Sequence, residues 1–291
     1  MIHADTYRDW STLLYQSEHA PKHVPLARCS SLGTRGIHTR SWAGTDSFGE
    51  AMELAVQGWD DGALLAEPYT SALFAQIHGL IERPEIVLDY TGEGFDIARL
   101  TSGEPEHWLR WENVLTPGLN PRVLRVLVDS FVSAGIEQET IRARGSVLLA
   151  LVELAEFAGY RVELSLVLSS SSHSHTGDRL QLYAPIKQAD QPAHPPRLAF
   201  ALAHPAMFRR IWFGVVESLE PELGSRFGAG DYYCTPGTAD SEGYDLSIPR
   251  MGLYDSHWQN AETARRWILD RLQEFGITLT EGTHAYSQIN R

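Results

Sequence analysis

The stretch from Leu124 to Leu168 constrains the fold of this chain more than any other. An apolar run begins at Leu124, a long helical segment covers 141–157, Gly159 follows, and a second apolar run covers 161–168. Short apolar runs bounded by turn residues are typical of buried strands. A glycine just past a helix is typical of a left-handed cap. The pattern predicts one strand–helix–strand unit.

The helix of this unit has a small, apolar stripe on one face. Its members recur at steps of three and four residues: Ile141, Gly145, Leu148, Val152, Ala155 and Gly159. A helix that lies on a sheet needs such a face, and Gly145 predicts a close approach to a strand. A third strand is predicted over 179–186. Helices over 198–203, 207–219 and 261–275 and a short strand over 247–252 continue the alternation. We therefore expect an α/β fold with a Rossmann-like sheet core over residues 119–277.

A smaller α+β subdomain is expected over residues 45–118. Ser47, with Glu50 three residues later, fits a capping box at a helix start, and a second helix is predicted over 64–80. The proline-containing stretch 116–121 predicts the boundary between this subdomain and the core.

Within the subdomain, apolar runs over 85–90 and 95–100 flank a glycine-containing turn and predict a hairpin. Gly103 and the residues after it predict a short helix, with Trp108 and Trp111 packed inward. The alternative is a ligand or acid–base cluster formed by Glu104, Glu106 and His107.

The two ends of the chain are less constrained. Residues 1–44 form an N-terminal arm, which Trp10, Leu13 and Leu14 provide with an apolar face. The sequence leaves open whether this arm is disordered or docks on another part of the protein or on a partner. The tail over 278–291 is expected to be loose.

Composition excludes several classes of protein. The formal net charge of −13 disfavours a broad phosphate-binding surface, so nucleic acid is not an expected partner. No apolar run approaches the roughly 18–20 residues that cross a bilayer, and the first residues do not resemble a secretory signal. We expect a protein of the cytoplasm without a membrane span. Cys29 and Cys234 are too few for a disulfide framework.

The motifs of common enzymes are missing. The chain has no phosphate loop, no dinucleotide-binding glycine pattern, no serine elbow and no His-Glu-x-x-His. His173 and His175 have a spacing found in zinc sites but lie in a serine-rich stretch. Asp129 ends a predicted central strand, where open α/β sheets bind ligands, although a capping role is the simpler interpretation. Arginines that could meet an anion, or only line a solvated face, are Arg142, Arg144, Arg209 and Arg210.

The predicted core resembles a von Willebrand factor A-type domain. In that family an Asp-x-Ser-x-Ser motif at the end of the first strand holds Mg²⁺ for a partner's acidic residue. The corresponding residues here are Asp129, Ser130, Phe131, Val132 and Ser133. Phe131 stands where the family has its middle serine. The resemblance implies Asp129, Ser130 and Ser133 as metal ligands of a degenerate site.

A second resemblance is to an uncharacterised family of proteins encoded by actinobacterial phages and prophages. It rests on the stretches 47–59 and 95–106 and on Arg142-Ala-Arg-Gly145 with its helix. Only two of the 24 basic residues are lysines, a skew typical of a GC-rich genome. The resemblance implies an origin and carries no activity.

These observations favour a binding or assembly protein that acts through protein–protein contacts and is not an enzyme. Its partner would be another protein or a second copy. The contact surfaces would be the N-terminal arm and the loop over 224–243 with Tyr232 and Tyr233, and Arg142 and Arg144 are further candidate binding residues. The alternative is a Mg²⁺-dependent hydrolase or nuclease centred on Asp129, with Asp178 or Asp231 nearby. We expect the cytoplasm of the host cell, and association with a virion stays open.

Overall fold

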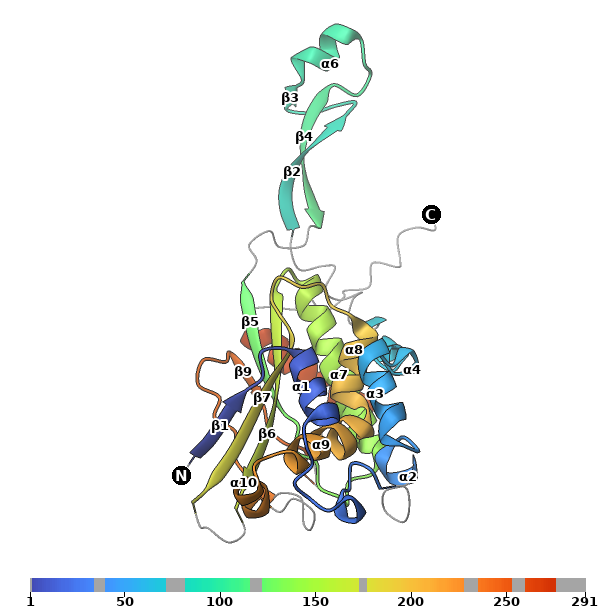
Figure 1. Ribbon diagram of the computed structural model, residues 1–291. Helices are drawn as coiled ribbons and strands as arrows, with labels where there is room; N and C mark the ends of the chain where they lie inside the picture. The colour runs from blue at the N-terminus through green and yellow to red at the C-terminus, as the bar shows by residue number, and fades with distance from the viewer. Residues whose placement is uncertain are drawn as a thin grey trace.

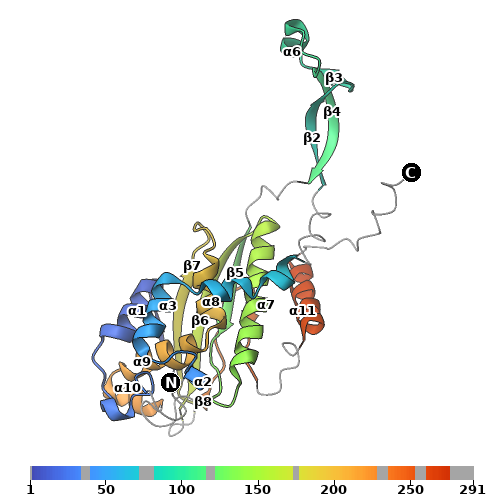
Figure 2. The same ribbon diagram turned by 90° about the vertical axis from the view of Figure 1, so that its right-hand side faces the viewer.

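The computed structural model describes residues 2–33, 40–71, 82–115, 122–172, 177–227, 235–252 and 260–275. These residues form a large mixed sheet flanked by helices, and a separate small sheet that stands away from it in both views (Figures 1 and 2). The predicted α/β fold is confirmed. His173, His175, Tyr232, Tyr233, Cys234 and the tail over 278–291 lie outside the described residues.

The main sheet has the strand order β1-β7-β6-β5-β9, and β8 pairs with the end of β6. β5 is parallel to both β6 and β9, and β1 is parallel to β7, whereas β6 and β7 are antiparallel. The strands are β1 (Ile2–Thr6), β5 (Val123–Asp129), β6 (Arg161–Ser171), β7 (Arg179–Lys187), β8 (Thr235–Pro236) and β9 (Leu246–Ile248).

The predicted strand–helix–strand unit is confirmed as β5, α7 (Gln138–Phe157) and β6. Gly159 has a φ of 90° just after α7, as the left-handed cap requires. The close approach predicted at Gly145 occurs, but its neighbour is a helix. A Cβ at Gly145 would lie 2.3 Å from the Cα of Ala203, which is in α8. Gly145 therefore lets the two helices α7 and α8 pack closely.

The two faces of the main sheet differ in chemistry because side chains alternate along each strand. One face carries apolar side chains that form the core with the helices, among them Val126, Val128, Leu166 and Leu182. A layer of helices covers this face, with α7 and α8 packed against each other within it. α3 and α4 contact α8, and α11 lies beside α7 (Figure 2). The helices of the main body are α1 (Trp10–His19), η1 (Leu26–Arg28), α2 (Arg40–Ala43), α3 (Phe48–Gln57), α4 (Asp60–Leu64), α8 (Pro195–Ala203), the π-helical η3 (Met207–Ile211), α9 (Trp212–Glu217), α10 (Pro221–Arg226) and α11 (Ala261–Glu274).

The N-terminal arm docks on the main body. β1 adds to the edge of β7, Leu13 and Leu14 of α1 are buried, and the Trp10 indole N–H donates to the carbonyl of Ala55 at 3.0 Å. Of the two alternatives that the sequence left open, docking applies to residues 2–33. The arm therefore uses its apolar face inside its own chain.

The predicted capping box at the start of α3 is confirmed in part. The Ser47 hydroxyl accepts the Glu50 N–H at 3.1 Å, whereas the Glu50 carboxylate accepts the N–H of Asp46 and not that of Ser47. Both α3 and α4 pack on α8. These two helices thus lie in the helical layer of the main body, and the division of the chain at residues 45 and 119 stays a prediction.

The small sheet consists of β2 (Glu82–Asp89), β3 (Gly94–Phe95) and β4 (Trp108–Leu115), in the order β2-β4-β3, with α6 (Ile97–Ser102) between β3 and β4. Two predictions fail here. Residues 95–100, predicted as a strand, are mostly helical because the Asp96 carboxylate caps the N–H groups of Ala98 and Arg99. Trp108 and Trp111, predicted in a helix, lie in β4, which pairs with β2 over its whole length.

Candidate functional site

The face of the main sheet that turns away from the helices is polar near the end of β5. Asp129 and Ser169 share this face with Gln181 and Tyr183 of β7, as the strand register requires. β5 lies between β6 and β9 and is parallel to both. The carboxyl end of such a strand is the usual ligand position of an open α/β sheet.

Asp129 is enclosed at this position. The residue is only 4 % exposed to solvent. One carboxylate oxygen accepts the Phe131 N–H at 3.0 Å, and the other accepts the Ser169 hydroxyl at 2.6 Å. Burial raises the pKa of Asp129, and these two hydrogen bonds, with Arg144 and Arg250 nearby, oppose the increase. Both oxygens of the carboxylate are therefore engaged within the chain.

Residues 237–245, between β8 and β9, lie against the polar face, and we call this segment the roof. Side-chain donors hold it through its backbone carbonyls: Gln181 donates to Thr238 at 2.9 Å, and Tyr183 donates to Asp240 at 2.9 Å. The backbone approaches β6 so closely at Gly237 that a Cβ there would lie 2.9 Å from the backbone of Ser170. The roof is thus attached at several points, and it closes the strand end.

The other predicted metal ligands do not gather around Asp129. The Ser130 hydroxyl donates to the carbonyl of Val167 at 2.8 Å, and Ser133 is half-buried in the following turn. Asp178 pairs with Arg226 at 3.1 Å. Asp129 lies beside Val167 of β6, and Arg179, the residue after Asp178, lies beside Ser171. Val167 and Ser171 are four residues apart, so Asp178 and Asp129 are separated by ~13 Å along the strand direction. Asp231 lies outside the described residues. In the described ranges, no group of three or more His, Cys, Asp or Glu side chains could hold a metal ion.

The two predicted binding arginines of α7 have different surroundings. Arg144 is 1 % exposed and donates to the carbonyls of Asp129 and Pro249, at 3.2 and 2.8 Å. It therefore ties the chain just after β9 to the end of β5. Arg142 is half-buried, donates to the Gln138 amide oxygen at 3.0 Å and lies 5.8 Å from the Trp59 ring. Their role in binding a partner stays a prediction.

Arg209 and Arg210 of η3 are also buried. Arg210 donates to the Thr45 hydroxyl at 3.0 Å and to the carbonyls of Ser31 and Gly33 at 2.8 and 2.9 Å. Arg209 lies 4.6 Å from the Trp42 ring and donates to the carbonyls of Trp42 and Ile136, and burial lowers its pKa to about 10. These guanidinium groups bind the backbone of the N-terminal arm and of the chain around it.

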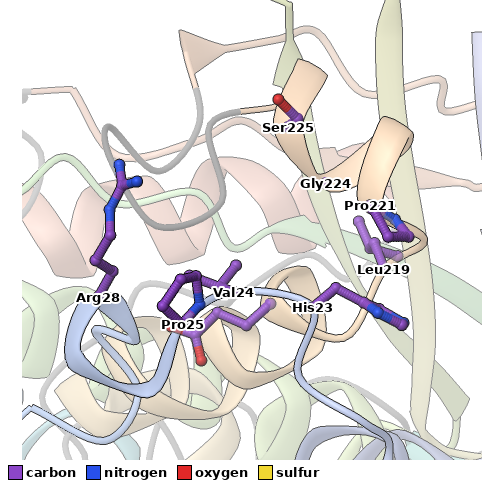
Figure 3. A pocket seen from close by; sticks show the side chains of 9 residues that line it. His23, Val24, Pro25, Arg28, Leu219, Pro221, Gly224 and Ser225 are labelled. Atoms are coloured by element: carbon purple, nitrogen blue, oxygen red, sulfur yellow. The ribbon is translucent and has the colours of Figure 1, made fainter.

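A hollow of about 200 Å³ lies between the N-terminal arm and the chain around α10 (Figure 3). His23 and Arg28 line one side, and Leu219, Pro221 and Ser225 line the other. The Glu217 carboxylate at this hollow accepts both the N–H and the hydroxyl of Ser31. The hollow is smaller than the roughly 300–1,000 Å³ of a ligand pocket, and its acidic group serves to hold the arm.

The small sheet has the most exposed apolar surface in the described part of the chain. The described residues include fifteen exposed large hydrophobic side chains, and seven of these lie between residues 86 and 111. Ile86 faces Trp111 across the ladder and Leu88 faces Leu109, so these four side chains share one face. Ile86 is 53 % exposed and Trp111 57 % exposed. We call this set, Ile86, Leu88, Leu109 and Trp111, the arm face; it belongs to the small sheet and not to the N-terminal arm.

Sequence reasoning missed the arm face, although a signal was present. Ile86, Leu88 and Tyr90 are spaced two apart, as are Leu109 and Trp111, and residues two apart share one face of a strand. Val87 and Trp108 interrupt the alternation and weaken this signal. The extensive contacts of β2, β3 and β4 in the described ranges are with one another. The face is therefore not covered by the helical layer that covers the main sheet.

The fold thus defines an α/β protein with a closed strand end and a small, separate sheet. The chain matches a protein family described as a domain of unknown function, DUF7192, over residues 2–278, and it belongs to that family. No curated protein and no solved structure matches it. No helix in the described ranges is long and apolar enough to span a membrane.

Proposed function

We propose that this protein is a binding or assembly protein that contacts a different protein through the arm face. The exposure of Ile86, Leu88 and Trp111 on one side of a small sheet carries the proposal. A sheet of three strands needs an apolar face that packs against something to be stable, and contiguous exposed apolar surface marks interaction sites. Aromatic side chains such as Trp111 are the usual anchors of such contacts.

Charge favours a different protein over a second copy. Residues 82–115 contain eight aspartates and glutamates and three arginines, which give a formal charge of −5. Two copies of this small sheet placed together would bring like charges into contact, which opposes association. A second copy therefore fits this surface less well than a partner of opposite charge.

The alternative, a Mg²⁺-dependent hydrolase centred on Asp129, receives less support. Both oxygens of Asp129 already accept hydrogen bonds from the chain, and the roof covers the strand end. A hydrolase would need room there for a metal and a substrate. Tyr232 and Tyr233 remain candidate contact residues of a second surface. A phage or prophage origin, the likeness to a von Willebrand factor A-type domain and a cytoplasmic or virion location belong to the proposal as well.

Photo-crosslinking tests this function. A photoreactive phenylalanine at position 111 should form a crosslink with one protein in the cells that naturally make this chain, and mass spectrometry should identify it as a different protein. The matched control places the same residue at position 56, because Val56 is 62 % exposed on α3 of the main body. Crosslinks from position 111 that match those from position 56, or that join two copies of this chain, would contradict the proposal.

A further inference from the structure

The outer edge of β2 is open. In the sheet order β2-β4-β3 this strand is at one end, and no strand in the described ranges pairs with its other side. The backbone N–H and C=O groups of an edge strand are free to pair with an added strand. Pro84 has no N–H to donate. Only every second residue of β2 directs its N–H and C=O away from β4, so alternate residues of the strand supply the donors of the open edge.

The side chains next to this edge are apolar on one face of the sheet. Ile86 and Leu88 lie on the edge strand itself, and Leu109 and Trp111 lie behind them on β4. A strand added beside β2 would place every second side chain on this same face. An apolar residue at those positions would bury Ile86 and Leu88, which are 53 % and 37 % exposed. Strand addition would thus satisfy the open backbone and cover the arm face together.

The charge of the small sheet determines which side chains fit around this apolar face. Arg110 pairs with Asp89 at 3.0 Å and Arg99 pairs with Glu104 at 2.8 Å, both within the same unit. The unit has five more carboxylates than arginines, which gives its formal charge of −5. Lysine or arginine at the alternate positions of an added strand would meet this negative field, which steers and selects a partner.

We infer that β2 accepts, as an added strand, an extended segment of a different protein in which apolar side chains alternate with lysine or arginine. This inference rests on the proposed function and names the binding mode and the chemistry of the partner. The backbone edge supplies affinity, the arm face selects apolar side chains, and the carboxylates select cations.

A set of labelled eight-residue peptides tests the inference on the full chain. The probe alternates valine with lysine, one control alternates valine with glutamate, and a second control has four valines followed by four lysines. We expect fluorescence anisotropy to show that the alternating lysine peptide binds at least 10-fold more tightly than either control. Binding should weaken as salt increases because exposed charges are screened. Equal binding of the glutamate peptide, or no binding of the lysine peptide at millimolar concentration, would overturn the inference.

The position of binding is tested with hydrogen exchange and variants. The lysine peptide should slow amide exchange within residues 82–90 and leave residues 122–172 unchanged. The double variant Ile86→Ser, Trp111→Ser should lose binding at least 10-fold, whereas Val56→Ser should retain it. Slower exchange only in the main body would overturn strand addition. If position 111 still crosslinks to a different protein while the lysine peptide fails, the inference is wrong and the proposed function stands. If that crosslink is absent, the proposed function itself is wrong.

Discussion

In β6 of the main body every residue from Leu164 to Ser170 is buried, whereas in β2 of the small sheet Ile86 and Leu88 remain exposed. The two strands have similar apolar side chains, but only β6 has a helical layer over it. In the main body, polar groups are also engaged by the chain, as the Asp129 carboxylate and the Arg210 guanidinium show. The comparison shows that the main body covers the apolar side chains of its strands, whereas the small sheet leaves Ile86 and Leu88 exposed.

The largest expected effect is at Arg210, which tests whether the main body depends on its buried polar contacts. Arg210→Met removes the donors to the carbonyls of Ser31 and Gly33 and to Thr45. Buried acceptors left without donors are costly, so we expect the free energy of unfolding in urea to fall by about 3–5 kcal/mol. Arg266→Met, at an exposed position of α11, is the control and should change the free energy of unfolding by less than about 0.5 kcal/mol. A loss below about 1 kcal/mol at Arg210 would show that the N-terminal arm does not depend on this contact.

His204 gives the main body a pH dependence. Its ring is buried between Phe200 and Trp59, its Nδ1 accepts the Ala206 N–H at 3.1 Å, and burial lowers its pKa to about 3. The unfolded chain protonates this histidine near pH 6.5. Stability is therefore full above about pH 6.5 and is lost as the pH falls from there toward 3, by up to ~1.4 kcal/mol per pH unit.

His204→Asn should remove this dependence, because asparagine offers an acceptor to the Ala206 N–H and does not titrate. Urea unfolding of both proteins at several pH values between 7 and 4 measures the difference. The two proteins should converge as the pH falls. An equal decrease in both would show that other groups cause the loss.

Asp129 tests the closed strand end and has a smaller expected effect. Its pKa is raised in the folded protein, so the stability that its protonated form contributes is present at low pH and is lost as the pH rises through the folded-state pKa. Asp129→Asn keeps an acceptor for the Phe131 N–H without a charge. We expect its free energy of unfolding at pH 7 to lie within about 1 kcal/mol of the wild-type value. Millimolar Mg²⁺, Mn²⁺ or Zn²⁺ should not raise the unfolding midpoint of either protein. A midpoint raised by metal in the wild type and not in the variant would favour the hydrolase.

The smallest expected effect on stability is at Trp111. Because this side chain is 57 % exposed and lies outside the main body, Trp111→Ser should change the free energy of unfolding by less than about 0.5 kcal/mol. Val56→Ser is the matched control. The same variant should weaken binding of the alternating lysine peptide, whereas a large loss of stability would mean that the arm face packs on the main body.

The sequence predicts those parts of the fold that depend on local patterns. Apolar runs around Val126 and Leu166 and the glycine at 159 are sufficient for β5, α7 and β6, and Asn260 and Ser47 mark helix starts that the structure contains. Short apolar runs are ambiguous, which explains the errors at residues 95–100 and at Trp108. Asp96 and Gly103, which cap α6 at its two ends, are local signals of a short helix in this stretch.

The candidate site was harder to predict because it depends on contacts between distant residues. Asp129 was placed correctly at a strand end, but its enclosure depends on Ser169, 40 residues later, and on the roof at residues 237–245. Likewise, nothing in the local pattern of Arg209 and Arg210 shows that carbonyls of the N-terminal arm will surround them. The spacing of Ile86 and Leu88 and of Leu109 and Trp111 is a partial signal for the arm face, but its exposure depends on what packs beside it.

Amide hydrogen exchange of the free protein tests the central claim most directly, because it compares the two regions in one measurement. We predict that the amides of Ile86 to Asp89 exchange far faster than those of Leu164 to Leu168, and that this difference does not change with protein concentration. Protection of β2 equal to that of β6 in the free protein would contradict the claim, since it would mean that the arm face is already covered.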